Sequence, residues 1–282
     1  MQIYQAIILG IVQGLTEFLP VSSSAHLNLF PWILGWEAMP EAFDVSLHIG
    51  TLLAMVIFFF KDWIRLFVGG YNQVVKKKKT TDGKIFWYLV ISTIPAGILS
   101  LILDKISKKI FEKSLNLEML IISITLIVMG IILYIVDKKA KNKTKYEDIT
   151  LKQSVIIGAS QSLAAAFPGV SRSGITMTVA RALGVDREGA AKYSFLLATP
   201  ITAAAVLVNV SNFKFTSIAF WLGILTSFLV GILVIKFLLA FLKKGSFKAF
   251  AIYRIILRFS CNLYNYYKNV TRILQKCNKN VI

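Results

Sequence analysis

The most reactive side chains of this chain lie together in residues 17–26, EFLPVSSSAH, within an otherwise apolar N-terminal stretch. They include a carboxylate, Glu17, three consecutive serines and one of only two histidines, His26. Glu17 and the spacing Ser23-x-x-His26 offer a nucleophile, a proton acceptor and a hard oxygen ligand for a metal ion. Gln13 lies four residues before Glu17, so the two side chains share one face of a helix. This pattern predicts a catalytic site.

Other polar residues near this cluster have simpler interpretations. Serines are common packing and hydrogen-bonding residues between membrane helices, and we assign Ser22 and Ser24 that role. The second histidine, His48, precedes the small residues Gly50 and Thr51, which indicate close helix packing. We therefore expect a structural or supporting role for His48.

A second polar cluster, PGVSRSG at residues 168–174, contains Arg172 just before an expected helix start at Gly174. The planar guanidinium of arginine suits phosphate oxygens, and the backbone N–H groups of a helix N-terminus add further anion-binding donors. The expected phosphate-binding residues are Ser171, Arg172, Ser173, Gly174 and Thr176. The charged residues of 179–193 are expected to form a solvated, interfacial connection, with Arg181 as a further candidate for phosphate binding.

The two clusters belong to an internal repeat. Shifting the chain by 148 residues places residues 6–26 over residues 154–174 without a gap, and both segments have an apolar stretch, a proline and then serines. The identical pairs are Ile8/Ile156, Gly10/Gly158, Gln13/Gln161, Leu15/Leu163, Pro20/Pro168 and Ser23/Ser171. A duplication of this kind puts Arg172 at the position of Ser24 and faces it toward Glu17 and His26. An acidic group that can hold a divalent cation, an arginine clamp and a nucleophile together suggest phosphoryl transfer.

The elements that position these clusters are membrane-spanning helices. The chain has 282 residues, of which only 16% are charged, and a mean hydropathy of +0.67; soluble domains carry about a quarter charged residues. Several apolar runs have the roughly 20 residues that a helix needs to cross a bilayer. The expected spans are about 43–60, 85–103, 117–136, 189–213, 215–242 and 247–267, the last interrupted by Arg254 and Arg258.

Basic loops predict how these helices are oriented. The net charge of +18 is explained by lysines that set topology and meet anionic head groups, not by nucleic acid. Residues 61–84, interpreted as a loop, carry seven Lys or Arg, and residues 137–152 carry six, against four in residues 104–116. The first two loops are therefore placed in the cytoplasm. The N-terminus lacks the features of a secretory signal, and the two cysteines, Cys261 and Cys277, indicate neither a disulfide framework nor a zinc site.

Each polar cluster is too short and too broken by proline to lie in an ordinary spanning helix, so we interpret both as re-entrant hairpins. The fold class is then all-α, with an inverted-topology repeat of about six transmembrane helices and two hairpins, and with the polar site near the midplane. The expected parts are a first half at 1–148 with its hairpin at 6–36, a second half at 149–267 with its hairpin at 153–184, and a polar tail at 268–282.

The motifs QGLTEFLPVSSSAH and PGVSRSG resemble the two signature motifs of the undecaprenyl-diphosphate phosphatases, also called the bacitracin-resistance family. Gln13, Glu17, Pro20, Ser23 and His26 fit the first signature, and residues 168–174 fit the second. The resemblance covers roughly residues 1–258. It implies an enzyme of the bacterial cell membrane that removes the terminal phosphate of undecaprenyl diphosphate, recycles the carrier lipid for peptidoglycan synthesis and confers bacitracin resistance. It also implies a divalent cation, Mg²⁺ or Ca²⁺, which we assign to Glu17 and Gln13; some members have Glu at the position of Gln13.

The expected mechanism is hydrolysis of the β-phosphate. Arg172, with Ser171 and Ser173, would hold the diphosphate, and Ser23 or His26 would be the nucleophile while the other assists proton transfer. Metal-activated water is the open alternative. The expected partners are the polyprenyl diphosphate substrate and membrane lipids, with a homodimer as a further expectation. A polyprenyl-phosphate transporter, or flippase, is the alternative function, because inverted repeats with broken helices also build transporters.

Overall fold

The computed structural model describes residues 1–37, 39–111 and 115–258. Within them the chain folds into eleven numbered α-helices, two short 3₁₀ helices and a last helical stretch at 248–258. The elements are α1 (Ile3–Thr16), α2 (Ser23–Leu34), α3 (Glu41–Phe58), α4 (Phe60–Val75), α5 (Thr81–Phe111), α6 (Leu115–Lys139), η1 (Tyr146–Asp148), α7 (Leu151–Ser160), α8 (Ser162–Ala166), α9 (Arg172–Ala182), α10 (Arg187–Asn209), η2 (Val210–Asn212) and α11 (Ile218–Leu242).

Five of these helices, α3, α5, α6, α10 and α11, are long and apolar enough to cross a membrane. This confirms the predicted all-α membrane architecture. The sixth expected span, 247–267, is helical at 248–258. Its remainder, the tail at 268–282 and both cysteines lie outside the described residues. The inverted orientation of the two halves and a re-entrant path for the hairpins stay predictions.

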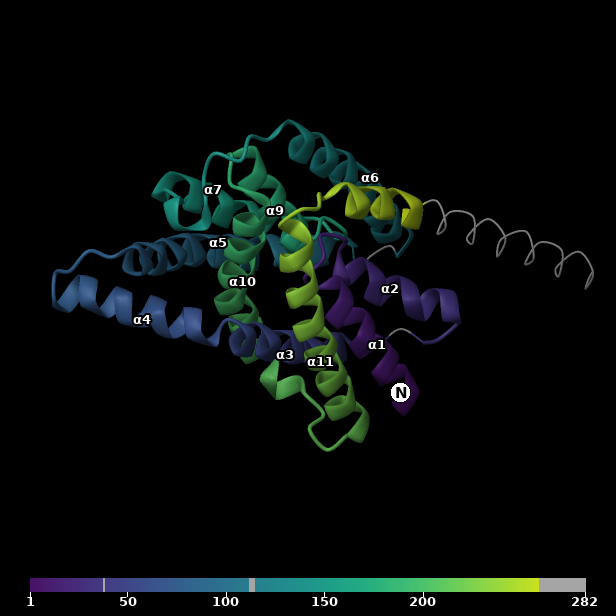
Figure 1. Cartoon of the computed structure of the whole chain (residues 1–282). Helices are drawn as coiled ribbons and strands as arrows, with labels where there is room; N and C mark the ends of the chain where they lie inside the picture. Colours follow the sequence, from purple (N-terminus) through teal and green to yellow (C-terminus); the bar gives the residue numbers. More distant parts are fainter. Residues whose placement is uncertain (38, 112–114, 259–282) are drawn as a thin grey trace, which may run out of the picture.

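One expected loop is a helix. The sequence predicts a loop at residues 61–84, between two apolar runs, but α4 fills residues 60–75 and lies against the start of α5 (Figure 1). Gly69 and Gly83 allow this contact, since a Cβ on Gly69 would lie 2.6 Å from the backbone nitrogen of Gly83. The lysines at 76–79 are confined to the end of α4 and the turn that follows it. Counting charge over the whole segment therefore concealed an amphipathic helix.

The two polar segments pack against long helices from the other half of the chain. The N-terminal helix α1 lies along α11, where Gly10 approaches the backbone oxygen of Gly223 so closely that a Cβ would come within 2.5 Å of it. In the same manner α7 lies against α5, where a Cβ on Gly158 would come within 2.8 Å of the oxygen of Ser92. The halves are therefore interleaved, and each polar segment depends on the partner half for its packing surface.

Each polar segment contains a helix break: the first break, residues 17–22, separates α1 from α2, and the second break, residues 167–171, separates α8 from α9. Both end in a serine with positive φ, Ser22 at 75° and Ser171 at 72°. Because the two serines are 149 residues apart, the gapless shift of 148 is wrong at this point. One extra residue, Gly169 with φ +88°, brings Arg172 into register with Ser23, not with Ser24.

The expected solvated connection at 179–193 is partly buried. Arg181 is 1% exposed and donates from Nε to Asp137 Oδ1 at 2.8 Å and from Nη1 to the carbonyl of Val185 at 2.6 Å. Arg187 donates to the same Asp137 oxygen at 2.8 Å, and the backbone N–H of Phe247 donates to Oδ2 at 3.1 Å. This carboxylate joins α6, α9, α10 and the start of the last helix, so Arg181 supports the fold instead of reaching phosphate.

Candidate active site

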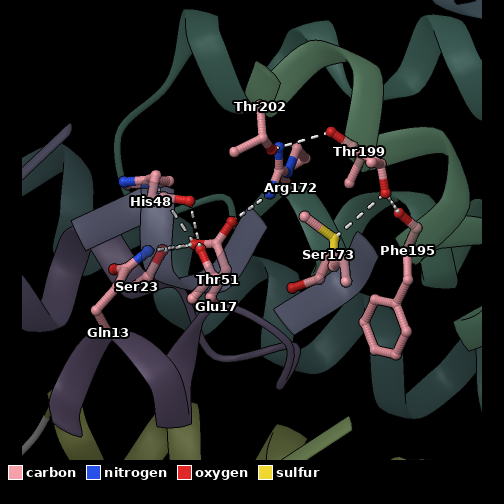
Figure 2. A network of polar contacts seen from close by, with 12 residues as sticks. Gln13, Glu17, Ser23, His48, Thr51, Arg172, Ser173, Phe195, Thr199 and Thr202 are labelled. Atoms are coloured by element: carbon pink, nitrogen blue, oxygen red, sulfur yellow. Dashed lines mark hydrogen bonds and ion pairs between the residues drawn. The ribbon is translucent and has the colours of Figure 1, made fainter. Parts of the chain in front are cut away.

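Glu17 is the centre of a polar network at the first break (Figure 2). Its side chain is 5% exposed. Oε2 accepts hydrogen bonds from Gln13 Nε2 at 3.0 Å and from Ser23 Oγ at 2.7 Å. Oε1 accepts from Nη2 of Arg172, which comes from the second break. The structure thus brings together four predicted site residues, Gln13, Glu17, Ser23 and Arg172.

Arg172 is held in place from a second direction. It is the first residue of α9, and its Nη1 donates to the hydroxyl of Thr202 on α10. Its side chain remains 21% exposed, so part of the guanidinium faces open space. Sequence analysis missed Thr202, because it lies 30 residues beyond Arg172 within an apolar helix.

His48 lies beside Glu17, with Nε2 3.6 Å from Oε2 of the carboxylate. Its Nδ1 lies 3.0 Å from the carbonyl of Asp44, the residue one turn earlier on α3. A carbonyl accepts only from a proton-bearing nitrogen, so Nδ1 carries a proton in this contact and Nε2 is the ring nitrogen that faces Glu17. The expectation of a supporting role stays a prediction, but the location is adjacent to the network.

A cavity of about 250 Å³ opens onto this network. Its polar wall contains Glu17, Ser23, Arg172 and His48, and its apolar wall comes mainly from α8 and α10. The residues that line it are Glu17, Ser22, Ser23, Ser24, His48, Ser100, Gln161, Ala164, Ala165, Ser171, Arg172, Ile201, Thr202 and Ala205. A larger cavity of about 530 Å³ near the N-terminus contains none of the predicted site residues. The smaller cavity is therefore the candidate site.

His26 is placed differently from Ser23. It is 1% exposed, with Nδ1 2.7 Å from the carbonyl of Ser22 and Nε2 2.8 Å from the hydroxyl of Tyr253. The His26 and Tyr253 rings also stack, with an interplanar angle of 4°. Both ring nitrogens are engaged and the residue does not line the cavity. In this arrangement His26 supports the backbone of the first break, and Ser23 pairs with Glu17.

Three of the expected phosphate-binding residues contact protein, not the cavity. Ser173 Oγ donates to the carbonyl of Leu19 at 3.1 Å, and Thr176 shares a hydrogen bond of 2.6 Å with Ser194. The N–H of Gly174 donates to Ser171 Oγ at 3.1 Å. A Cβ on Gly174 would lie 3.0 Å from Nη1 of a buried arginine. In this motif, Ser173 therefore links α9 to the first break, and the absence of a side chain at Gly174 leaves space for the buried arginine.

That arginine is Arg254, which is fully buried. Nη1 donates to the carbonyl of Pro20 at 3.1 Å in the first break. Nη2 donates to the carbonyls of Gly169 at 2.9 Å and Val170 at 3.2 Å in the second break, and Nε donates to the carbonyl of Leu126 at 3.2 Å. In the sequence, Arg254 stands out only as an interruption of the last expected span. Its position inside an apolar segment was itself a signal, because buried charges in membranes are rarely without function.

The residues present fit a divalent cation, although weakly. The described residues contain no group of three His, Cys, Asp or Glu side chains that could hold a metal ion. Glu17 nevertheless offers a carboxylate, Ser23 a hydroxyl, and the buried Oε1 of Gln13 has no hydrogen-bond partner in the described structure. Mg²⁺ and Ca²⁺ both prefer oxygen ligands, and Mg²⁺ is commonly held by one or two carboxylates plus phosphate oxygens.

The chain is similar to known proteins over nearly its full length. The model of the family described as bacitracin resistance protein BacA matches residues 6–259. An undecaprenyl-diphosphatase of Caldicellulosiruptor bescii is 45% identical over 261 residues, which cover 91% of this chain and 95% of that protein. Undecaprenyl-diphosphatases of Moorella thermoacetica (43% identical, covering 91% of this chain and 95% of that protein) and Desulforudis audaxviator (45% identical, covering 90% and 94%) are similar to this chain to about the same degree.

Proposed function

The chain belongs to the bacitracin resistance protein family, and we propose that the cavity beside Glu17 is where its lipid substrate is hydrolysed. The enzyme is an undecaprenyl-diphosphatase that releases inorganic phosphate from undecaprenyl diphosphate. The other product, undecaprenyl phosphate, is the carrier lipid used again in peptidoglycan synthesis. The chemistry is then phosphoryl transfer from a diphosphate to water.

One observation carries the assignment of the site. Ser23 donates to a carboxylate oxygen of Glu17 at 2.7 Å, and the other oxygen of that carboxylate accepts from Arg172. A nucleophile, its base and a cation for phosphate oxygens therefore lie in one partly enclosed cavity, although Arg172 is 155 positions from Glu17 in the chain. Phosphoryl transfer depends mainly on such positioning and on electrostatic stabilisation.

In the first step, Ser23 Oγ attacks the terminal phosphorus and passes its proton to Glu17 Oε2. The bond between that phosphorus and the bridging oxygen breaks, and undecaprenyl phosphate leaves with the electron pair of this bond and takes the proton from Glu17. Arg172 holds the oxygens of the transferred phosphate, where negative charge is greatest. The intermediate is a phosphoserine at Ser23.

In the second step, Glu17 takes a proton from a water molecule that attacks the phosphoserine. The bond from phosphorus to Ser23 Oγ breaks, inorganic phosphate leaves, and the proton returns to Ser23. The same carboxylate thus serves both steps, which is consistent with its contact with the serine. A divalent cation held by Glu17 and Gln13 would supply charge neutralisation for the diphosphate.

Two alternatives remain outcomes of the test. His26 as nucleophile needs its ring to leave the contacts with Ser22 and Tyr253. Activated water in place of Ser23 would give no phosphoserine. Transport without hydrolysis is not favoured, because it requires no serine paired with a carboxylate and because the relatives are named for hydrolysis.

The cavity also suits the lipid part of the substrate. Ala164, Ala165, Ile201 and Ala205 form an apolar wall next to the polar network. We place the prenyl chain along this wall and the protein in the bacterial plasma membrane, surrounded by membrane lipids. A homodimer stays a prediction.

The assignment is tested by phosphate release from undecaprenyl diphosphate by the purified protein in detergent. Glu17→Gln and Ser23→Ala are each expected to lower the rate by about 10³-fold, since both remove a group that takes part in bond making or proton transfer. Ser123→Ala is the matched control, because this buried serine donates to the carbonyl of Met119 on its own helix and lies outside the cavity.

Phosphate-labelled substrate adds a direct readout. A denaturing quench at neutral pH, which preserves both phosphoserine and phosphohistidine, should give label on Ser23 in the wild type and none in Ser23→Ala. Near-normal turnover by either site variant would remove that residue from the mechanism. Label on His26 instead of Ser23 would assign the nucleophile to the histidine.

A further inference from the structure

Gln161 is a buried amide at the junction between α7 and α8 that the mechanism above does not use. It is 3% exposed and lines the cavity. Neither its Nε2 nor its Oε1 has a hydrogen-bond partner within the described part of the chain. A buried amide without a partner is unfavourable, because it loses its hydrogen bonds to water and gains none in return. Its presence in this cavity therefore points to a ligand.

Comparison of the two halves of the repeat shows how Gln161 differs from its counterpart, Gln13. Gln13 is its counterpart in the first half, and Gln13 Nε2 donates to Glu17, four residues later on the same helix face. Four residues after Gln161 the chain has Ala165, which also lines the cavity. The second half thus keeps the amide donor but lacks the carboxylate that would accept from it, and an N–H donor is left for an anion.

The charges around the cavity favour a phosphate as that anion. The cavity that Gln161 lines is also lined by the neutral side chains of Ala164 and Ala165 and by the cation Arg172. Glu17 lies in the other half and is already paired with Arg172 and Ser23. A phosphate near Gln161 would therefore meet a donor and a positive charge, with no carboxylate on the same segment to repel it.

A diphosphate has two phosphates, and the proposed mechanism places the transferred one at Ser23 and Arg172. We propose that Gln161 Nε2 binds the other phosphate, the one that stays on the lipid, and that Gln161 is a substrate-binding residue of the leaving-group site. This inference rests on the proposed function. The apolar side chains beside Gln161, including Ala164 and Ala165, are where a prenyl chain attached to that phosphate would continue.

The arrangement also predicts a preference for diphosphates over monophosphates. A lipid monophosphate has one phosphate and cannot occupy Gln161 and the Ser23–Arg172 pair together. The donor at Gln161 also strengthens as charge develops on the departing lipid phosphate, so it assists cleavage of the bridging bond. A binding site for the leaving group follows from one unpaired amide.

Product inhibition of the full-length enzyme tests this assignment. Undecaprenyl phosphate and inorganic phosphate are each added as inhibitors of phosphate release from undecaprenyl diphosphate. In Gln161→Leu, which keeps the bulk and removes the donor, the inhibition constant of undecaprenyl phosphate is expected to rise about tenfold, the value of one hydrogen bond to a charged group. That of inorganic phosphate, which binds at Arg172, should not change. Gln161→Glu should weaken undecaprenyl phosphate more, because its carboxylate repels the phosphate.

Gln153→Leu is the control on the same helix. Gln153 caps α7 through Thr150 and lies outside the cavity, so this variant loses stability without altering either inhibition constant. Equal increases in both constants for Gln161→Leu, or no change in either, would overturn the inference while leaving the proposed function in place. A wild-type protein that releases no phosphate would instead overturn the proposed function, and the inference with it.

Discussion

At the first break, Ser22 has a φ of 75°, its Oγ accepts from the N–H of Ala25 at 3.4 Å, and it lies 3.3 Å from the hydroxyl of Ser24. At the second break, Ser171 has a φ of 72°, its Oγ accepts from the N–H of Gly174 at 3.1 Å, and it lies 3.3 Å from the hydroxyl of the serine two residues later. The backbone and the capping hydroxyls are the same in both halves.

The side chains placed on that shared frame differ. The residue after the capping serine is Ser23 in the first half and Arg172 in the second, and the glutamine-plus-four position is Glu17 in the first and Ala165 in the second. In the proposed mechanism, the first half supplies the nucleophile and its base, and the second half supplies the cation. The serine motif is a common backbone frame on which two positions differ between the halves, and in the folded chain Arg172 of one half contacts Glu17 of the other.

The largest expected effect comes from a change at Arg172 that weakens phosphate binding by the second half. Arg172→Lys keeps the charge but loses the two-pronged donor that reaches both Glu17 and Thr202. Phosphate release should fall by about 10²- to 10³-fold, as when one strong donor to the transition state is lost. Thermal unfolding in detergent should change little; a large loss of stability would show that Arg172 mainly holds the halves together.

The second prediction concerns Arg254, which is common to both breaks. Arg254→Met removes hydrogen bonds to carbonyls of Pro20, Gly169 and Val170 and leaves them without these donors. We expect a loss of about 3 kcal/mol in unfolding free energy, since several buried acceptors become unsatisfied at once. The measurement is thermal unfolding in detergent. Arg254→Lys should recover only part of the loss, because a single ammonium group cannot reach all these carbonyls.

An unchanged unfolding temperature for Arg254→Met would contradict this account. The matched control is Arg65→Met, which removes an exposed arginine paired with nearby Asp62. Surface ion pairs contribute about 0–1 kcal/mol, so this control should remain close to the wild type.

The smallest expected effect tests whether the two breaks contribute equally to the stability of the protein. Ser22→Ala and Ser171→Ala each remove one helix-capping hydroxyl, which costs about 1 kcal/mol, and each places alanine at a positive φ. The two losses of stability should be nearly equal if the breaks are equivalent frames. Unequal losses, measured by unfolding in the same detergent, would mean that the two breaks have the same backbone geometry but contribute differently to stability.

The meeting of Glu17, Ser23 and Arg172 could be predicted because the two motifs and the repeat appear directly in the sequence. The helical membrane architecture followed from the length of the apolar runs. The register error at Gly169 arose because a single extra residue in a turn does not disturb the identities on either side of it. Hydrophobic pattern and composition alone could not reveal that insertion.

Thr202 and Arg254 could not be assigned because their partners are distant in sequence and are joined only by packing. His48 was noticed, but its proximity to Glu17 depends on how α3 passes the end of α1. The expected pairing of Ser23 with His26 followed sequence spacing, whereas the ring of His26 turns toward Tyr253 on the last helix. Local spacing predicts which residues share a helix face, but it does not show which of several possible partners a side chain contacts in the folded chain.

Arg254 also limits how this protein can move. Alternating access by rocking requires the two broken elements to separate and rejoin during each cycle, and here one buried guanidinium donates to carbonyls of both. Separation would break these bonds in an apolar interior where water cannot replace them. We therefore expect the lipid to reach a fixed site by diffusing laterally within its leaflet, so that entry and exit of its long isoprenoid tail take the place of rocking of the two breaks.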